Sequence, residues 1–107
     1  MSDALMLEFT GVTEEQYRAV NSILGVDTIA GTGDWPRGLL DHTGATSADG
    51  TLIVFEVWES QQSQSDFMNN RLGHALNQAG LPTPSRVQWF TVVGQAAPGK
   101  SAVTGGI

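Results

Sequence analysis

A histidine and a glutamate on two neighbouring predicted strands are the residues of this chain best suited to acid–base chemistry. The turn signal Ser-Ala-Asp-Gly at 47–50 separates residues 38–46 from residues 52–59, so these segments are predicted strands of one hairpin. With the turn centred on this signal, directly opposed residues have numbers that sum to about 98. His42 then lies opposite Glu56, which could fix the imidazole tautomer for general base catalysis. The alternative interpretation is a partly buried histidine that is merely satisfied by a strand neighbour.

Two tryptophans could supply aromatic surface beside this pair. The same register places Leu40 opposite Trp58, so Trp58 is predicted on the same face as the histidine and the glutamate. Its ring could stack on a flat aromatic ligand, or it could belong to the core or to a dimer interface. Trp35 lies in the polar loop 26–37 and could close over the pocket mouth, or could only hold the loop in place.

Three further residues are assigned to the same pocket with less support. Met6 and Glu8 lie on the less apolar side of the first predicted strand, and His74 flanks the apolar stripe of the second predicted helix. Glu8, His42 and Glu56 could in principle form a two-carboxylate, one-histidine metal site. Because three ligands on three strands have no spacing signature, we expect no metal and no other cofactor.

The hydrophobic pattern predicts six elements in the order βαββαβ within one domain, residues 1–94. The four strands are expected at residues 4–9, 38–46, 52–59 and 86–94, and the two helices at 13–25 and 60–80. This order is the ferredoxin-like α+β arrangement, in which both helices cover one face of a four-stranded antiparallel sheet. Residues 95–107 are rich in Gly, Ala and Ser and are predicted to be a flexible tail.

The first helix carries recognisable start and stop signals. Thr13 and Gln16 have the spacing of a capping box, and Val12 and Tyr17 occupy the two positions of a hydrophobic staple. Gly25 is expected to end the helix in the left-handed conformation. Tyr17 is therefore assigned to the staple and not to an acid.

Alternation along the third predicted strand assigns its two faces. The apolar triplet Ile53, Phe55 and Val57 is assigned to the helices. The alternate residues, assigned to the uncovered face, are Leu52, Val54, Glu56 and Trp58. A partly apolar uncovered sheet face usually marks an interface, so we expect a homodimer whose two sheets face each other.

The composition argues against several classes of partner. The 107 residues carry a formal net charge of −6, with 11 acidic and 5 scattered basic residues, so neither nucleic acid nor an anionic membrane surface is expected as a partner. The absence of cysteine excludes disulfides and thiolate catalysis. No apolar run approaches the roughly 20 residues of a membrane span, and no secretory signal is evident, so a cytoplasmic protein is expected.

Four short motifs carry a resemblance to a known family. They are Leu-Met-Leu-Glu-Phe-Thr-Gly-Val-Thr at 5–13, Pro-Arg-Gly-Leu-Leu-Asp-His at 36–42, Val-Trp-Glu-Ser at 57–60 and Gly-Leu-Pro-Thr-Pro at 80–84. With these motifs the chain resembles small proteins of the dimeric α+β barrel superfamily, of the antibiotic biosynthesis monooxygenase type. The resemblance extends over about residues 5–93 and implies the same fold.

The resemblance implies a small-molecule-binding protein. Characterised relatives include cofactor-independent oxygenases that act on polycyclic phenols and quinols, and haem-degrading enzymes. Of the Asn, Trp and His that the haem-degrading type uses, only the Trp has a counterpart here, at Trp58, which disfavours haem degradation. The leading hypothesis is a cofactor-independent, monooxygenase-like enzyme acting on a planar aromatic substrate. The alternative is a non-catalytic ligand-binding or stress-regulatory dimer.

Overall fold

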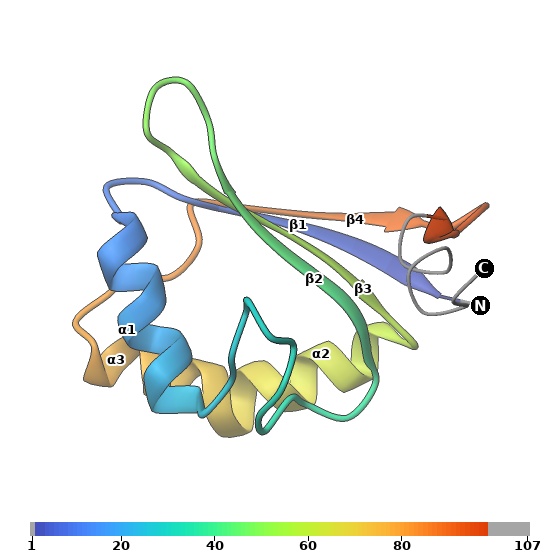
Figure 1. The fold of residues 1–107 in the computed structure, drawn as a ribbon, viewed down its shortest axis with the longest axis horizontal. Coiled ribbons are helices and arrows are strands. Elements are labelled where there is room, and N and C mark those ends of the chain that lie inside the picture. The colour runs from blue at the N-terminus through green and yellow to red at the C-terminus, as the bar shows by residue number, and fades with distance from the viewer. Residues whose placement is uncertain (1, 99–107) are drawn as a thin grey trace.

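The computed structural model describes residues 2–98 as one antiparallel sheet with helices packed on one of its faces (Figure 1). The strands are β1 (Asp3–Phe9), β2 (Leu39–Thr46), β3 (Leu52–Trp58) and β4 (Arg86–Thr91). The helices are α1 (Glu14–Leu24), α2 (Gln61–Phe67) and α3 (Gly73–Gln78), and the π-helix η1 (Met68–Leu72) joins α2 to α3. The predicted βαββαβ order and the ferredoxin-like α+β class are confirmed. Most of the predicted tail, residues 99–107, lies outside the described residues.

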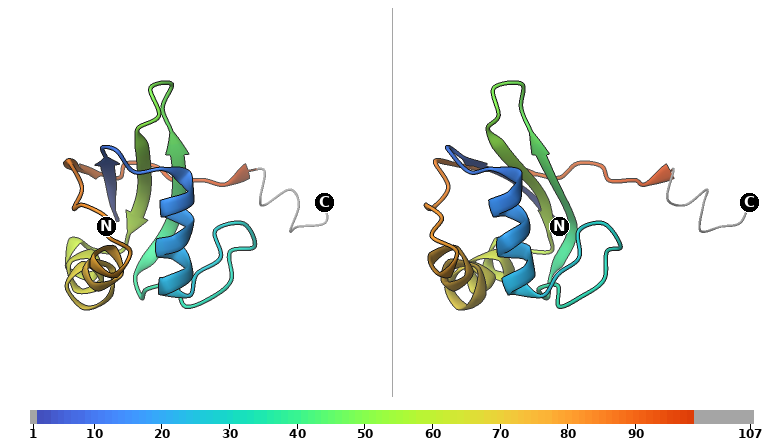
Figure 2. Two further views of the ribbon diagram at one scale, coloured as in Figure 1. Left: turned by 90° about the vertical axis from the view of Figure 1, so that its left-hand side faces the viewer. Right: turned by 60° about the vertical axis from the view of Figure 1, so that its left-hand side comes forward.

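The sheet has the strand order β2-β3-β1-β4, and each neighbouring pair is antiparallel. Figure 2 shows α1 and the continuous α2–η1–α3 segment side by side on the same side of this sheet. The opposite face has no helix over it within residues 2–98. No helix in the described part of the chain is long and apolar enough to cross a membrane.

The predicted helix signals act as expected. The backbone N–H of Gln16 donates to the Thr13 hydroxyl over 3.2 Å, and the Thr13 N–H donates to the Gln16 side chain over 2.9 Å, which completes the capping box. Gly25 ends α1 with a φ of 77°, in the left-handed region that favours glycine. Of the two candidate caps for the second helix, Ser60 is the one that accepts the N–H of Ser63.

The assignment of the two faces of β3 is wrong. The side chains that lie under the helices are Leu52, Val54, Glu56 and Trp58, all buried. The alternate residues Ile53, Phe55 and Val57 lie on the uncovered face, where Phe55 is 45% exposed. A strand that is apolar on both sides cannot be oriented by its own alternation, because either face could be the inner one.

Strand β1 explains the true orientation. Leu5 and Leu7 are buried under the helices, and they lie directly opposite Glu56 and Val54 in the antiparallel register. Directly opposed residues point to the same side of a sheet, so β1 commits the glutamate face of β3 to the core. Glu56 is tolerated there because both of its carboxylate oxygens accept hydrogen bonds.

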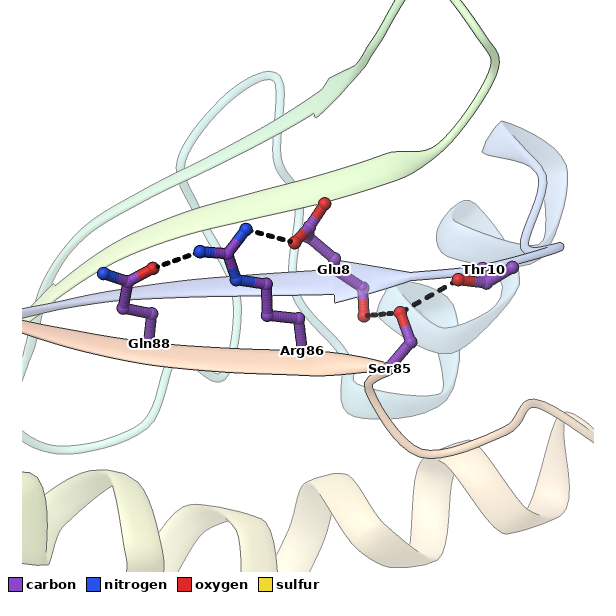
Figure 3. A network of polar contacts seen from close by, with 5 residues as sticks. All are labelled: Glu8, Thr10, Ser85, Arg86 and Gln88. Carbon is purple, nitrogen blue, oxygen red and sulfur yellow. Dashed lines mark hydrogen bonds and ion pairs between the residues drawn. The ribbon is translucent and has the colours of Figure 1, made fainter.

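The uncovered face, hereafter the open face, combines apolar and charged side chains. Its apolar members, read from the strand register, are Ala4, Met6, Ala45, Ile53, Phe55, Val57 and Phe90. Figure 3 shows its polar edge, where Arg86 reaches Glu8 over 3.4 Å and donates to Gln88 over 2.8 Å, on the side of the sheet away from the helices. On β4, Phe90 faces this side, whereas Trp89 lies opposite Leu5 and packs against the core.

Candidate functional site

A continuous chain of hydrogen bonds links α1 to the β2–β3 hairpin on the helix-covered side of the sheet. His42 Nδ1 lies 2.8 Å from Glu56 Oε2, and His42 Nε2 lies 2.6 Å from the Tyr17 hydroxyl. The indole N–H of Trp58 donates to Glu56 Oε1 over 3.0 Å. The structure therefore brings together four side chains from three elements, ordered Tyr17, His42, Glu56 and Trp58.

The predicted pairing of His42 with Glu56 across the hairpin is confirmed, but the pairing next to it is wrong. A β-bulge lies between Leu39 and Asp41, so Leu39 and not Leu40 is opposite Trp58. The extra residue of a bulge is left unpaired, and Leu40 is exposed. The register that carries the histidine begins on the hairpin side of this bulge and is unaffected by it.

The buried carboxylate at the inner end of this chain determines which atom donates in each hydrogen bond. Glu56 is 6% exposed and the His42 side chain 12% exposed. A Glu56 carboxylate can only accept hydrogen bonds, so His42 Nδ1 carries the proton and Nε2 accepts from the Tyr17 O–H. Burial raises the pKa of Tyr17 above its usual value of 10.0, and the Asn21 amide partly offsets this effect. Tyr17 is therefore a neutral phenol that donates at neutral pH.

Gly44 makes room for the Tyr17 ring. A Cβ atom at Gly44 would lie 2.5 Å from the Tyr17 hydroxyl oxygen and 2.6 Å from the ring carbon that carries it. Gly44 is two residues beyond His42 on the same strand, so it presents its bare backbone to the same side. Tyr17 was assigned only to the helix staple. The sequence signal that could have identified it is a glycine two residues from the histidine, because such a gap on a strand face admits a large side chain.

Trp35 completes the surroundings of the imidazole. Its ring centroid lies 5.4 Å from that of His42, with the planes tilted by 52°. The indole N–H of Trp35 donates to the Thr32 carbonyl over 2.9 Å, which ties the tryptophan to its own loop. The loop 26–37 thus lies beside His42 on the helix-covered side of the sheet, whereas the pocket was predicted on the uncovered face.

Two open clefts meet at His42. One has a volume of about 450 Å³ and lies between α1 and β2, with Tyr17 and His42 in its wall. The other has a volume of about 400 Å³ and lies under the loop, with Trp35, Leu39 and His42 in its wall. Ligand pockets commonly measure about 300–1,000 Å³, so each cleft is large enough for a small organic molecule.

The structure does not place Trp58 where a ligand could stack on it. Its side chain is 0% exposed, its ring lies 5.8 Å from that of Phe67, and its N–H is bound to Glu56. The core interpretation of Trp58 is the correct one. Its contribution to the site is to hold one oxygen of the buried carboxylate.

Three other residues assigned to the pocket lie elsewhere. Met6 and Glu8 are on the open face as predicted, but the wrong orientation of β3 had placed the pocket there too. His74 is exposed on α3, because the residues after it, Ala75 and Leu76, are the ones that pack into the core. None of the three lines the clefts beside His42.

The sheet also separates the three residues considered as metal ligands. Glu8 points to the open face, whereas His42 and Glu56 lie under the helices. Within residues 2–98, no three His, Asp or Glu side chains are grouped so that they could hold a metal ion. The arrangement that the structure does provide is a carboxylate, an imidazole and a hydroxyl in series, which resembles the order of groups in a hydrolase triad.

Comparisons with known proteins define the fold. No protein-family model matches the chain, and no curated protein matches it by sequence. Among solved structures it is similar to Rv0793 from Mycobacterium tuberculosis, at 20% identity and a TM-score of 0.63, over 91% of this chain and 100% of that one. It is also similar to a putative antibiotic biosynthesis monooxygenase from Chloroflexus aurantiacus, at 16% identity and a TM-score of 0.61, over 91% and 98% of the two chains.

A third similar structure is SnoaB from Streptomyces nogalater, described as a cofactor-independent oxygenase. The identity is 16% and the TM-score 0.59, over 88% of this chain and 95% of SnoaB. At these identities the comparison establishes the fold and leaves the chemistry to the residues of this chain. The chain therefore has the fold of the antibiotic biosynthesis monooxygenase-like proteins, as its motifs predicted.

Proposed function

We propose that this protein is a small-molecule enzyme in which His42, held by Glu56, removes a proton from an aromatic ligand through the Tyr17 hydroxyl. The observation that carries the proposal is the unbroken series of hydrogen bonds from Tyr17 to Glu56. Its inner end is a buried carboxylate, and its outer end, at Tyr17, lies in the wall of the larger cleft. A proton taken up at the outer end has a defined path to the imidazole.

Each step of that path uses a group in the required protonation state. A ligand hydroxyl donates its proton to the Tyr17 oxygen while Tyr17 passes its own proton to His42 Nε2. The imidazolium formed in this way keeps its Nδ1–H directed at Glu56. Positioned general bases commonly contribute about 10²- to 10⁴-fold to a rate.

The reaction we propose is cofactor-independent oxygenation of a planar, electron-rich phenol or quinol. A deprotonated substrate transfers one electron to dioxygen, and the radical pair then joins in a new C–O bond. Cleavage of the O–O bond with loss of water turns the attacked ring C–H, which is a CH₂ in the keto tautomer of the phenol, into a carbonyl, so no external reductant is consumed. The description of SnoaB as a cofactor-independent oxygenase supports this reaction class. Trp35 would supply aromatic surface for the ligand ring.

We also propose that the protein is a homodimer that pairs through the open face. Phe55 and Phe90 are each 45% exposed there, next to further apolar side chains of β1 and β3. A contiguous exposed apolar patch of this kind is typical of an interface. The charged pair of Arg86 and Glu8 lies at one edge of this patch, where it would form a polar rim.

The test of the enzymatic proposal is oxygen consumption by the purified protein with a panel of planar phenols and quinols, with no metal or cofactor added. The wild type should consume oxygen with at least one phenol that it binds. His42→Gln should lose roughly 10²-fold or more in turnover, because Gln cannot accept a proton near neutral pH.

His74→Gln is the matched control, since it makes the same substitution at an exposed histidine on α3 and should keep full turnover. Both variants are compared at a temperature where urea unfolding shows each to be folded. Binding of phenols without any oxygen consumption by the wild type would contradict the enzymatic proposal and favour the ligand-binding alternative.

A further inference from the structure

The connection between α1 and β2 is long and is ordered by its own hydrogen bonds. It covers residues 25–38, whereas a typical connection between elements has about four to six residues. Figure 2 shows it standing out beside α1, in teal. Loops of more than about 12 residues are uncommon in compact domains, and they are usually either functional or disordered. Because this loop is ordered, a functional role is the expected one.

Residues 25–34 of this loop, hereafter the flap, form a small hairpin. Val26 and Gly33 pair as an isolated antiparallel bridge. At the base of the flap, the Asp34 N–H donates to the Gly25 carbonyl over 2.8 Å. A Cβ atom at Gly33 would overlap that carbonyl oxygen, so the close approach of the two arms requires a glycine.

One carboxylate orders the turn at the far end of the flap. Asp27 Oδ1 accepts from the N–H of Ile29 over 2.8 Å and from the N–H of Ala30 over 2.9 Å. The bonds from the Ala30 and Ile29 N–H groups lower the pKa of Asp27 below its usual value of 3.8, so this carboxylate is ionised at neutral pH. The Asp27 carbonyl also accepts from the Gly31 N–H over 2.9 Å. All of these bonds are internal to the flap, so their effect is to fix its tip.

Arg71 attaches the base of the flap to the body of the protein. Its guanidinium donates to the carbonyl of Leu24, one residue before the flap, over 3.0 Å. It also donates to the carbonyl of Asp34, the last residue of the flap, over 2.6 Å. The flap is thus ordered internally and held at both ends, which gives its tip a defined position beside the proposed site.

The tip places an apolar side chain at the larger cleft. Ile29 is 85% exposed and lies in the wall of the cleft that also contains Tyr17 and His42. Its neighbour Thr28 lines both this cleft and the smaller one. Isolated exposed apolar residues are common on protein surfaces. Here, however, a dedicated set of hydrogen bonds holds the side chain beside the proton path, and a preordered contact lowers the entropic cost of binding a ligand.

We infer that Ile29 is a specificity-determining residue that contacts an apolar substituent of the ligand, an inference that rests on the proposed function. A phenol whose hydroxyl group reaches Tyr17 has its ring and its substituents in the same cleft. Leu52, the other large aliphatic residue of the wall, is only 3% exposed and already belongs to the core. Ile29 therefore offers apolar surface that a ligand can still cover, and the cleft should prefer alkyl-substituted phenols to polar ones.

Binding measurements by calorimetry test this preference without any turnover. The probes are meta- and para-propylphenol and their methoxymethyl analogues, in which an ether oxygen replaces one CH₂. The wild type should bind at least one propylphenol about fivefold or more tightly than its analogue, since burial of one or two CH₂ groups changes affinity by roughly that factor.

Ile29→Ala should remove the preference while the free energy of unfolding stays the same. Ile23→Ala is the matched control and should keep it, because Ile23 is 41% exposed on α1 and lines neither cleft beside His42. Asp27→Ala leaves Ile29 in place but removes the acceptor that orders the tip, so it should weaken the preference. A residue that served only to connect α1 to β2 would leave the preference unchanged.

The outcomes separate this inference from the proposed reaction. An equal preference in the wild type and in Ile29→Ala, or no preference in the wild type, would overturn the role of Ile29 and leave the proton path standing. Selective binding of propylphenols without oxygen consumption would support the role of Ile29 and contradict the proposed reaction. A wild-type protein that binds none of the four phenols would overturn the inference as well.

Discussion

At the scale of single residues, Glu56 is the group on which the site depends. Its two oxygens accept hydrogen bonds from His42 and from Trp58. One buried side chain thus fixes the tautomer of the base and gives the indole N–H of a core tryptophan its acceptor. Such a carboxylate could not be recognised from its strand alone, where it reads as the polar end of a half-buried face. Its role depends on which face of β3 turns inward.

Removal of Glu56 should therefore destabilise the fold. Glu56→Ala leaves the His42 and Trp58 N–H groups without acceptors in the core, and we expect a loss of about 3 kcal/mol in the free energy of unfolding. The measurement is urea unfolding. Glu59→Ala, at an exposed position three residues along the chain, should change the free energy by less than about 0.5 kcal/mol. Equal losses at the two positions would show that the carboxylate has no special structural role.

Gly44 should be as important to the site as the residues with functional groups. Gly44→Ala places a methyl group inside the space of the Tyr17 hydroxyl, so Tyr17 must move and its hydrogen bond to His42 must break. We expect Gly44→Ala to lose turnover, and we expect Tyr17→Phe to lose it to a similar extent. Gly94→Ala is the matched control, because a Cβ atom at Gly94 would meet no atom within 4 Å. Retention of turnover by Gly44→Ala would exclude Tyr17 from the proton path.

At the scale of elements, the β2–β3 hairpin supplies three of the four hydrogen-bonded side chains of the site, His42, Glu56 and Trp58. The turn residue Asp49 accepts from the Ser47 hydroxyl and from the Thr51 N–H, and these bonds lower the pKa of Asp49 from 3.8 to about 2. A carboxyl group with a lowered pKa stabilises the folded state fully above its unfolded pKa. That contribution is lost as the pH falls through the folded value of about 2.

Asp49→Asn should consequently lower the unfolding midpoint at pH 6, and the difference from the wild type should shrink between pH 4 and pH 2. Thermal unfolding followed by circular dichroism at a series of pH values measures this. Ser47→Ala removes the largest cause of the shift and should reduce the effect of Asp49→Asn. A difference between Asp49→Asn and the wild type that is constant with pH would show that the turn carboxylate does not titrate as described.

The π-helix η1 also connects elements that are distant in the sequence. Arg71 donates from η1 to the carbonyls of Leu24, over 3.0 Å, and Asp34, over 2.6 Å, and its guanidinium lies 5.4 Å from the Phe67 ring centroid. One side chain thus joins the end of α1 to the loop that holds Trp35.

Loss of the hydrogen bonds from Arg71 should allow Trp35 to move away from the His42 imidazole. In Arg71→Met we expect the NMR ring signals of His42 to shift by loss of the tryptophan ring current, while those of His74 stay in place. Arg18→Met removes an exposed arginine that pairs with Glu14 on α1, and it should leave both histidines unchanged. Unchanged His42 signals in Arg71→Met would show that Trp35 holds its position without the arginine.

The sequence predicts these elements better than it predicts their faces. The capping box, the Gly25 stop and the pairing of His42 with Glu56 depend on short-range chemistry, and all are confirmed. The orientation of β3 depends on its register with β1, and the opposed residues of these two strands are between 43 (Phe9 and Leu52) and 55 (Asp3 and Trp58) positions apart along the chain. The partnership of Tyr17 with His42 also requires the crossover of α1 over the hairpin, which no local pattern encodes.

At the scale of the whole molecule, the apolar patch on the open face predicts a homodimer. The protein should have twice the mass of the 107-residue chain in light scattering at micromolar concentration. Phe55→Glu places a charge in the apolar patch and should yield monomers. Ile29→Glu, at a loop position where the residue is 85% exposed, is the control and should remain dimeric. A wild-type protein that scatters as a single chain would exclude the dimer.

The proposed catalytic groups and the proposed dimer interface lie on opposite sides of the sheet. Tyr17, His42 and Glu56 lie under the helices of their own chain, and the apolar patch lies on the other side of the same strands. In the proposed dimer, every subunit would therefore have its own complete set of the proposed catalytic groups, and none of them would come from a neighbour. Ligand titration by calorimetry should give one ligand per chain and a hyperbolic isotherm, with the same affinity in the Phe55→Glu monomer as in the parent assembly.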